Sequence, residues 1–273
     1  MKVIAEGGAN ILIDYGDPGW LYRICKKFPE SLKKCNQYTS ENCQFINEEI
    51  KPFLGDLLCP MELKSIPLHR IKLIKHYFVN LDDNEAKLLK IKQLKGDSFR
   101  ETLFHDHFTS IYRSSTGGIL MEMKPKWLFS LLGYCRNCTH NIVKGRKINY
   151  CYKVLLTNAQ HFRDIASNCN CLPMEFVEDM IQYFGESDNV LKILHDAQKE
   201  LEAQQSDSVS FKEVSEKLLC CMTLRDVTCF LEWRPDLPIK VSVVDVDLKL
   251  KEKWAHWLKT HKELENCQSK VFH

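Results

Sequence analysis

The sequence predicts an α+β protein made of two lobes. Its first half alternates short apolar runs with turn residues, which is typical of strands. From about residue 149 the chain carries longer segments of helical periodicity, followed by two β-rich runs and a last helix. A chain of 273 residues is long enough for two lobes. We therefore expect an N-lobe over residues 1–118 and a C-lobe over residues 119–273.

The first half contains six segments predicted to be extended and one predicted helix. The helix is expected over residues 38–54, where apolar residues recur near helical spacing, with Thr39 or Ser40 as its N-cap. The segments expected to be extended are residues 3–4, 11–13 and 21–24, then 59–63, 88–94 and 119–124.

The second half is predicted to be mainly helical, with one hairpin near its end. Asp188 is the expected N-cap of the helix over residues 189–204, and residues 204–210 are predicted to form a polar loop. The expected helices cover residues 150–166, 173–184, 189–204, 211–221 and 251–265. The hairpin is expected from strands at residues 223–233 and 239–247.

Composition places the chain among ordinary globular proteins. Hydrophobic residues make up 44% and charged residues 27%, and no run of about 18 apolar residues predicts a membrane span. The N-terminus has no apolar signal-peptide core, so we expect a nuclear or cytoplasmic protein that is not secreted. The 13 cysteines are then expected to be reduced, mostly as small buried hydrophobes. A monomer is expected.

The net charge of +2 hides an uneven distribution of charge. No acidic residue occurs between Glu122 and Asp164. Cations that repel one another imply a local anionic partner, either a compact polyphosphate or nucleic acid. Few aromatic residues are spaced for stacking on bases, which argues against single-stranded nucleic acid. A solvated basic face is the alternative. This basic block contains Lys124, Lys126, Arg136, Lys144, Arg146, Lys147, Lys153 and Arg163.

A glycine-rich turn between the first two strands is a candidate nucleotide-phosphate site. Gly7 and Gly8 let backbone amides approach a phosphate, and Asn10 offers a hydrogen bond nearby. A turn between two strands corresponds to a kinase glycine-rich loop and not to a Walker loop. Arg23 on the next strand is placed to neutralise phosphates, or is a solvated edge arginine.

Charged residues near position 124 form a second candidate site. In an extended chain Glu122, Lys124 and Lys126 share one face, so all three could point into one cleft. A surface strand would show the same pattern.

The terminal hairpin predicts a cluster of carboxylates. With the turn centred near Asp236, Asp226 lies opposite Val246, so Asp226, Asp245 and Asp247 meet at one end of the hairpin. Facing carboxylates repel unless a cation lies between them, as where phosphotransferases hold a base near a Mg²⁺ ligand. A salt-bridged structural role is the alternative.

Three residues at the start of the last helix are predicted to share one face. Lys249, Lys253 and Trp257 recur every four residues, and an anionic ligand would relieve the repulsion between the two lysines.

The spacing Cys135-x2-Cys138, followed by Cys151, is typical of a zinc site. Three buried thiols without metal are the alternative. A zinc site needs a fourth ligand, for which His107 and His161 are the candidates.

Taken together, these motifs resemble the inositol-pentakisphosphate 2-kinase family in its short fungal-type form. The resemblance runs from residue 6 to about residue 257. It rests on Glu6-Gly-Gly-Ala-Asn10, Glu122-Met-Lys-Pro-Lys126, Arg136-x3-His140-x3-Lys144, Arg225-Asp-Val-Thr228 and Asp245-Val-Asp-Leu-Lys249.

The resemblance implies a distant protein-kinase-like fold with a basic inositol-phosphate-binding region in the C-lobe. It implies transfer of the γ-phosphate of ATP, with Mg²⁺, to the 2-hydroxyl of inositol 1,3,4,5,6-pentakisphosphate, which gives inositol hexakisphosphate. Asp226 would be the catalytic base. No nucleic acid and no membrane would be partners.

The resemblance also assigns binding roles. Asp245 and Asp247 would hold Mg²⁺, although Asp247 stands where other members can carry a serine, and Trp257 stands in place of a phosphate-binding tyrosine. Arg163 matches a distal phosphate-binding arginine only loosely. The stretch His105-Asp106-His107 would be the hinge beside adenine, with Asp106 and His107 as nucleotide contacts. The other nucleotide contacts would be Gly7, Gly8, Asn10, Arg23, Glu122 and Asp245. The inositol phosphate would contact Lys124, Lys126, Arg136, His140, Lys144, Lys249, Lys253 and Trp257.

Three other functions compete with this interpretation. Another inositol polyphosphate kinase would share the cations and prefer a different hydroxyl. A zinc-containing nucleic-acid-binding protein would bind duplex in a salt-sensitive way without turning over ATP. A catalytically dead scaffold is disfavoured because Asp226 and Asp245 are both present.

Overall fold

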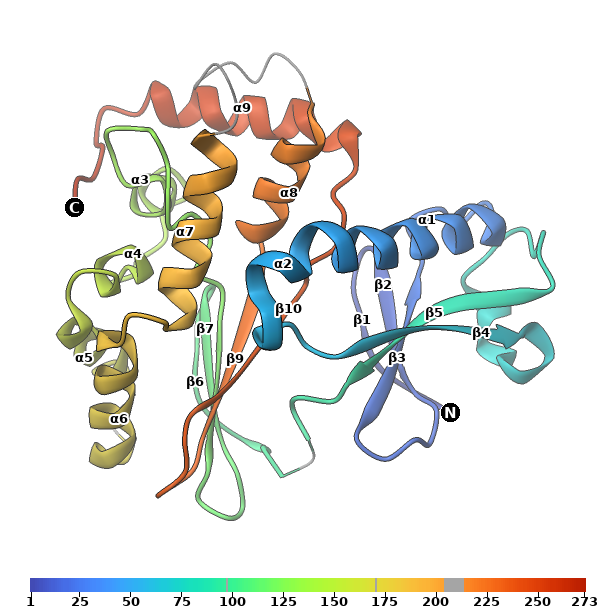
Figure 1. Ribbon diagram of the computed structural model, residues 1–273, viewed down its shortest axis with the longest axis horizontal. Coiled ribbons are helices and arrows are strands. Elements are labelled where there is room, and N and C mark those ends of the chain that lie inside the picture. The colour runs from blue at the N-terminus through green and yellow to red at the C-terminus, as the bar shows by residue number, and fades with distance from the viewer. Residues whose placement is uncertain (97, 170, 204–213) are drawn as a thin grey trace. The chain divides into compact units, whose positions relative to one another are not determined.

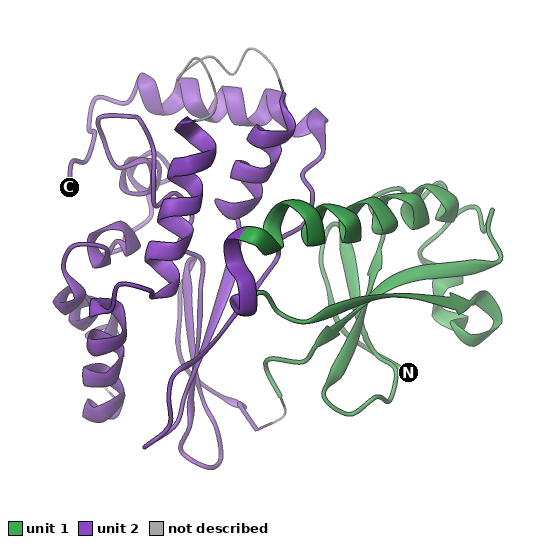
Figure 2. Ribbon diagram, in the orientation of Figure 1, with its two compact units in different colours: residues 1–52, 58–96 green, residues 53–57, 97–273 purple. Residues whose placement is uncertain are grey.

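A computed structural model describes residues 1–96, 98–169, 171–203 and 214–273. Its elements are helices and two five-stranded antiparallel sheets (Figure 1), which confirms the predicted α+β class. The chain divides into two compact units (Figure 2). The first contains residues 1–52 and 58–96, and the second contains residues 53–57 and 97–273.

The sheet of the first unit has the strand order β1-β2-β3-β5-β4. One side of this sheet is covered by α1 (Leu32–Phe45), which packs against β3, β4 and β5 (Figure 1). After α1 the chain continues as a π-helical turn, Ile46–Ile50, and α2, Lys51–Leu54. The strands are β1 (Lys2–Glu6), β2 (Asn10–Asp14), β3 (Trp20–Cys25), β4 (Met61–Pro67) and β5 (Glu85–Lys92).

The first helix begins earlier than the sequence analysis expected. Its N-cap is Ser31, whose hydroxyl accepts a hydrogen bond from the backbone of Lys34, and not Thr39 or Ser40. Those two residues lie inside α1 and donate to carbonyls four residues back. Ser31 also donates to Asp82 at 2.6 Å, a long-range contact that no local pattern reveals.

The sheet of the second unit has the order β10-β9-β8-β7-β6. Its first two strands, β6 (Glu101–His105) and β7 (Thr109–Arg113), were not predicted. Because β7 pairs with β8 (Ile119–Met123), residues 97–118 group with the second unit and not with the first, where the expected boundary at residue 118 had put them.

The predicted hairpin is formed by β9 (Thr228–Trp233) and β10 (Lys240–Val244). Its register pairs Glu232 with Lys240 and Thr228 with Val244. Continued by two residues, this register places Asp226 opposite Val246, as the sequence analysis expected. The paired strands end before that point, so Asp226 follows helix α8 and precedes the sheet.

The helices of the second unit flank its sheet (Figure 1). Helix α7 packs against α8, and α3 packs against α9. They are α3 (Arg136–Val143), α4 (Tyr152–Leu155), α5 (Phe162–Ala166), α6 (Met174–Gly185), α7 (Val190–Ala203), α8 (Glu216–Leu224) and α9 (Trp254–Glu265).

Three predictions for these helices need correction. The segment expected as one helix over residues 150–166 is interrupted between α4 and α5. The N-cap of α7 is Asn189, whose side chain accepts from two backbone amides of the first turn, and not Asp188. Part of the basic block, where the sequence analysis predicted no helix, is helix α3. The loop predicted at 204–210 and the start of the helix predicted at 211 lie outside the described residues.

Aromatic side chains form much of the core beside the second sheet. Phe162, Phe176, Phe184 and Trp233 are fully buried, and their rings are in contact at 5.6–5.9 Å between centroids. Nine of the 13 cysteines are buried as well. Within the described part of the chain, the helices are all too short or too polar to cross a bilayer.

The corrected start of α1 yields a stability test. We expect Ser31→Ala to lower the free energy of unfolding by about 1 kcal/mol, because it removes an N-cap. Ser40→Ala, inside the same helix, should change it by less, since alanine favours a helix interior. Urea unfolding followed by circular dichroism measures both. A larger loss for Ser40→Ala than for Ser31→Ala would contradict the assigned cap.

Candidate active site

A cavity of about 730 Å³ lies within the second unit and is lined by an excess of positive charge. Seven lysines and arginines line it against two carboxylates. A volume of this size is typical of a small-molecule site. The charged lining residues are Lys126, Arg136, Lys144, Arg146, Arg225, Lys249, Lys253, Asp226 and Glu252, with His107, His140 and His256 among the others.

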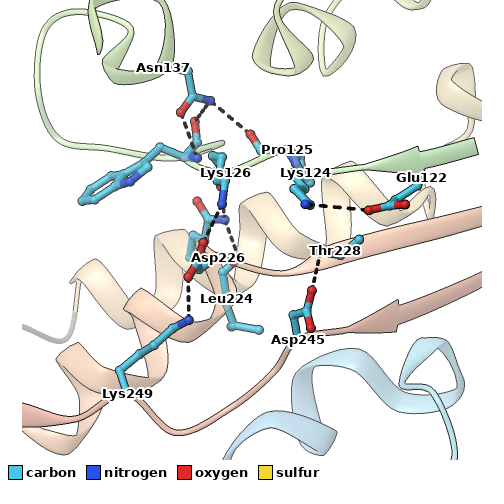
Figure 3. Close-up of polar contacts among 12 residues, drawn as sticks. Glu122, Lys124, Pro125, Lys126, Asn137, Leu224, Asp226, Thr228, Asp245 and Lys249 are labelled. Carbon is cyan, nitrogen blue, oxygen red and sulfur yellow. Dashed lines mark hydrogen bonds and ion pairs between the residues drawn. The ribbon is translucent and has the colours of Figure 1, made fainter. Parts of the chain in front are cut away.

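Asp226 lies at the centre of this charge and is bridged by two lysines (Figure 3). Lys126 Nζ is 2.5 Å from one carboxylate oxygen and Lys249 Nζ is 2.6 Å from the other. Burial raises the pKa of Asp226, but the charges and hydrogen bonds of Lys249 and Lys126 outweigh this and hold the pKa below its usual value. Asp226 is therefore ionised at neutral pH and able to accept a proton.

Trp127 separates two buried arginines at the wall of the cavity. The guanidinium carbons of Arg136 and Arg225 lie 4.0 Å and 3.7 Å from the centre of its ring. Two guanidinium groups this close to one ring cannot share a face, so the indole lies between them and attracts both. Arg225 is only 3% exposed and forms an ion pair with Glu202 at 2.6 Å.

Arg136 begins α3 and is only 6% exposed, yet its Nη1 has no hydrogen-bond partner. Burial, and then repulsion from Arg225, lowers the pKa of Arg136 to about 10. An unpaired donor of this kind is costly unless a ligand satisfies it. One turn further along α3, His140 also lines the cavity, and burial together with Arg146, Lys144 and Arg136 lowers its pKa to about 4.

Lys249, Lys253 and Trp257 line the same cavity, as their spacing predicted. They do not share the one helix face that was expected from the sequence. Lys249 lies before the helix, and Lys253 lies in a 3₁₀ turn, Lys251–Lys253, that leads into α9. Only Trp257 belongs to the helix itself.

Lys124 is not among the residues that line this cavity. The alternation of an extended chain holds only to Met123, where β8 ends. Lys124 Nζ lies 3.7 Å from Glu122, whereas Lys126 has a φ of 59° and leaves the extended path. The three charged side chains expected on one face are therefore divided between two places (Figure 3).

The carboxylates of the hairpin point in different directions (Figure 3). Asp245 accepts a hydrogen bond from Thr228 Oγ1 at 2.6 Å, and Asp226 contacts the two lysines instead. The backbone carbonyl of Asp247 accepts from Thr223 Oγ1 at 2.9 Å. Asp245 is exposed and has a φ of 62°.

His105 ends β6, and Asp106 and His107 lie in the tight turn, residues 106–108, that leads to β7. Asp106 accepts hydrogen bonds from the backbone amides of Phe108 and Thr109 and from the hydroxyl of Tyr150. Its carboxylate therefore shapes the turn. His107, assigned above to the nucleotide, lines the cationic cavity.

The glycine-rich turn lies in the first unit, between β1 and β2. Gly7 N donates to Asn10 O at 2.9 Å. A Cβ on Gly8 would meet nothing within 4 Å, and neither glycine has a positive φ, so the fold itself does not require glycine here. Arg23 belongs to β3, the central strand of the sheet, and is not on an edge.

A second constellation consists of three cysteines and a histidine. Cys135, Cys138, Cys151 and His273 have ligand atoms that all lie within 4.8 Å of one another. His273 reaches them because residue 271 is tied to α3: Cys135 N donates to the Val271 carbonyl, and Val271 N donates to Thr139 Oγ1.

The histidine beside the three cysteines is therefore His273, and not His107 or His161 as expected. His161 Nε2 accepts from the backbone of Cys151, and its Nδ1 pairs with Asp164, so both ring nitrogens are occupied. His107 lines the cationic cavity instead. The cysteine spacing predicted three members of this group, but the distant His273 had no local signal.

Other residues of the cavity were also missed. Arg146 was visible in the basic block and Arg225 in the motif before Asp226, but neither was selected. Trp127 and Asn137 form the wall beside Lys126, where only the folded structure places them.

Comparisons with known proteins identify the family of this chain. A model of the inositol-pentakisphosphate 2-kinase family matches residues 4–161. The chain is 43% identical to inositol-pentakisphosphate 2-kinase of Saccharomyces cerevisiae, over 100% of this chain and 99% of the relative. It is 43% identical to that of Candida glabrata, over 99% and 100% of the two chains, and 35% identical to that of Eremothecium gossypii over both entire chains. The chain therefore belongs to the inositol-pentakisphosphate 2-kinase family.

Proposed function

We propose that this protein transfers the γ-phosphoryl group of ATP to the 2-hydroxyl of inositol 1,3,4,5,6-pentakisphosphate and so makes inositol hexakisphosphate. The observation that carries the proposal is the cavity with seven lysines and arginines around one lysine-bridged aspartate. Full-length relatives bear the name of this activity. Action in the nucleus or cytoplasm, and a monomeric state, stay predictions from the sequence.

The cations of the cavity suit a substrate with five phosphates. Lysine and arginine form charge-assisted hydrogen bonds to phosphate oxygens, which are stronger than neutral ones. Buried Arg136 lines the cavity and its Nη1 has no hydrogen-bond partner, so in our proposal its guanidinium turns toward such an oxygen when the substrate binds. In our proposal Lys126, Lys144, Lys249 and Lys253 contribute further donors, His140 and Trp257 complete the contacts, and Lys124 acts from beside the cavity.

The bridged state of Asp226 suggests how the base becomes active. Phosphates entering the cavity compete for Lys126 and Lys249, which now neutralise the carboxylate. Asp226 can then accept the proton of the 2-hydroxyl. The hydroxyl oxygen forms a new bond to the γ-phosphorus, and the bond between that phosphorus and the bridging oxygen of ADP breaks.

The resemblance of the sequence assigns nucleotide contacts to the glycine-rich turn of the first unit and, separately, to residues of the second unit. Gly7 and Gly8 offer bare backbone that a phosphate can approach closely. Asn10 and Arg23 would add donors to the phosphates, Glu122 would bind the ribose, and the turn at Asp106 and His107 would flank adenine. A five-stranded sheet with a packed helix in the first unit accords with a kinase-like N-lobe.

Magnesium is assigned to Asp245 and Asp247. Carboxylate oxygens are the ligands that Mg²⁺ prefers, and Asp245 is exposed. The ion would neutralise charge on the ATP phosphates.

The cysteine–histidine group fits a structural zinc ion. The Sγ atoms of Cys135 and Cys151 are 3.7 Å apart, close to the roughly 3.8 Å edge of a zinc–thiolate tetrahedron with 2.3 Å bonds. Three thiols and one imidazole form a common structural zinc site. The ion would fasten residues 271–273 to α3, which carries Arg136 and His140.

We expect Asp226→Asn to lower kcat by on the order of 10²-fold or more, because the amide cannot take the proton of the hydroxyl. ATP and inositol pentakisphosphate should still bind, as isothermal titration calorimetry would show. A variant that keeps more than about a tenth of wild-type kcat would contradict the role of Asp226. A panel of inositol phosphates in the same ATP-consumption assay identifies the preferred substrate.

Charge reversal separates the cavity from the rest of the basic block. We expect Lys144→Glu to raise KM for the inositol phosphate far more than KM for ATP, because a donor is replaced by a like charge. Lys147→Glu is the matched control, since Lys147 is an exposed residue of the same block outside the cavity lining. Equal effects of the two substitutions would mean that net charge, and not the cavity, binds the substrate.

Elemental analysis tests the zinc site. Protein prepared without chelators should contain about one zinc per chain, and His273→Ala should hold it more weakly against a chelator. Cys43→Ser is the control, since Cys43 is half buried and lies outside the group. Zinc well below one equivalent in the wild-type protein would remove the proposal.

A further inference from the structure

The segment from Pro125 to Phe129 carries Lys126 into the cavity without regular secondary structure. Lys126 itself has a φ of 59°, in the left-handed region. For a residue with a Cβ this conformation costs about 1–2 kcal/mol, so the surrounding structure must hold it in place.

Two carboxamide side chains hold this segment. Asn137 in α3 donates to the carbonyls of Pro125 and Trp127 and accepts from the Trp127 amide, at 3.0–3.2 Å. Gln198 in α7 donates to the Lys126 carbonyl at 3.0 Å. Its Oε1 accepts from the amides of Leu128 and Phe129 at 2.9 and 3.1 Å. The backbone of the segment is thus satisfied by side chains in place of a sheet or helix.

Gln198 makes one more contact, which reaches the catalytic side of the cavity. Its Nε2 also donates to the Leu224 carbonyl at 3.1 Å, in the last turn of α8 and two residues before Asp226. One nitrogen therefore joins the peptide of Lys126 to the end of the helix that precedes Asp226. The ion pair between Lys126 and Asp226 closes the ring.

The Gln198 side chain has no exposed surface and uses its full hydrogen-bonding capacity. Few replacements can satisfy the same four partners. A glutamate would lose both amide donors and bury a charge, and an apolar residue would leave two carbonyls and two amides unpaired. The site thus requires a group that both donates and accepts.

We propose that Gln198 is a positioning residue that sets the distance between the substrate-binding Lys126 and the base Asp226. The inference rests on the proposed function. Gln198 itself is fully buried and does not line the cavity. It holds the two backbone segments in one arrangement, so that the hydroxyl of a substrate gripped by Lys126 arrives at the carboxylate of Asp226.

Steady-state kinetics of Gln198→Met test this role. Methionine has a similar length and no hydrogen bonds. We expect kcat to fall by on the order of 10²-fold, as for a misplacement of about 1 Å, while KM for inositol pentakisphosphate changes by only a few-fold. Asn189→Ala is the matched control, because Asn189 is an equally buried carboxamide with four hydrogen bonds at the other end of α7. It should lose stability and keep kcat.

The outcomes separate the possible failures. If the wild-type protein does not turn over inositol pentakisphosphate, the proposed function fails. If the wild-type protein does and Gln198→Met keeps its kcat, only the positioning role fails. Should Gln198→Met not fold, Gln198→Glu decides the question, since it keeps the acceptor for Leu128 and Phe129 and loses the two donors. If that variant also unfolds, Gln198 serves the fold alone and the proposal is overturned.

Discussion

Mutual repulsion among the cations of one cavity is the constraint on which the second unit depends. Several of these positive charges are offset by a nearby partner. Asp226 forms ion pairs with two lysines, Glu202 forms one with Arg225, and the ring of Trp127 lies between two guanidinium groups. Like charges this close destabilise a folded chain unless such partners offset them. Arg136 is only partly compensated, because its Nη1 has no hydrogen-bond partner. A buried donor without a partner carries a free-energy cost in the folded chain.

The partners of these cations also determine which ion pairs a bound phosphate would replace. Carboxylates and indole rings hold cations in place, but a phosphate competes best for those that are partly exposed. Lys126 and Lys249 contact Asp226 at the cavity, whereas the Arg225–Glu202 pair is more deeply buried. In our proposal the two partly exposed pairs exchange partners when phosphate binds, and the buried pair stays in place.

Local patterns predicted the features that depend on neighbours in sequence. The glycine turn, the register that places Asp226 opposite Val246, and the cysteine spacing follow from short-range rules of turns and period-two strands. Features that depend on distant partners were missed. Ser31 caps α1 with help from Asp82, β7 becomes a strand by pairing with β8, and Gln198 acts on a segment some 70 residues away. A single sequence carries no local trace of such contacts, so five of the seven lysines and arginines of the cavity were predicted, whereas Arg146, Arg225 and the arrangement of the set were not.

The tie between residues 271–273 and α3 has a consequence for the order of folding. A chain emerges from the ribosome N-terminus first, so α3 emerges before Val271 and His273. Val271 forms hydrogen bonds with Cys135 and Thr139, and His273 completes the cysteine group. Until then α3 lacks these restraints. Contacts of such long sequence separation form late and slow the folding of a chain. Residues 271–273 must therefore be synthesised before the group of three cysteines and one histidine can be complete.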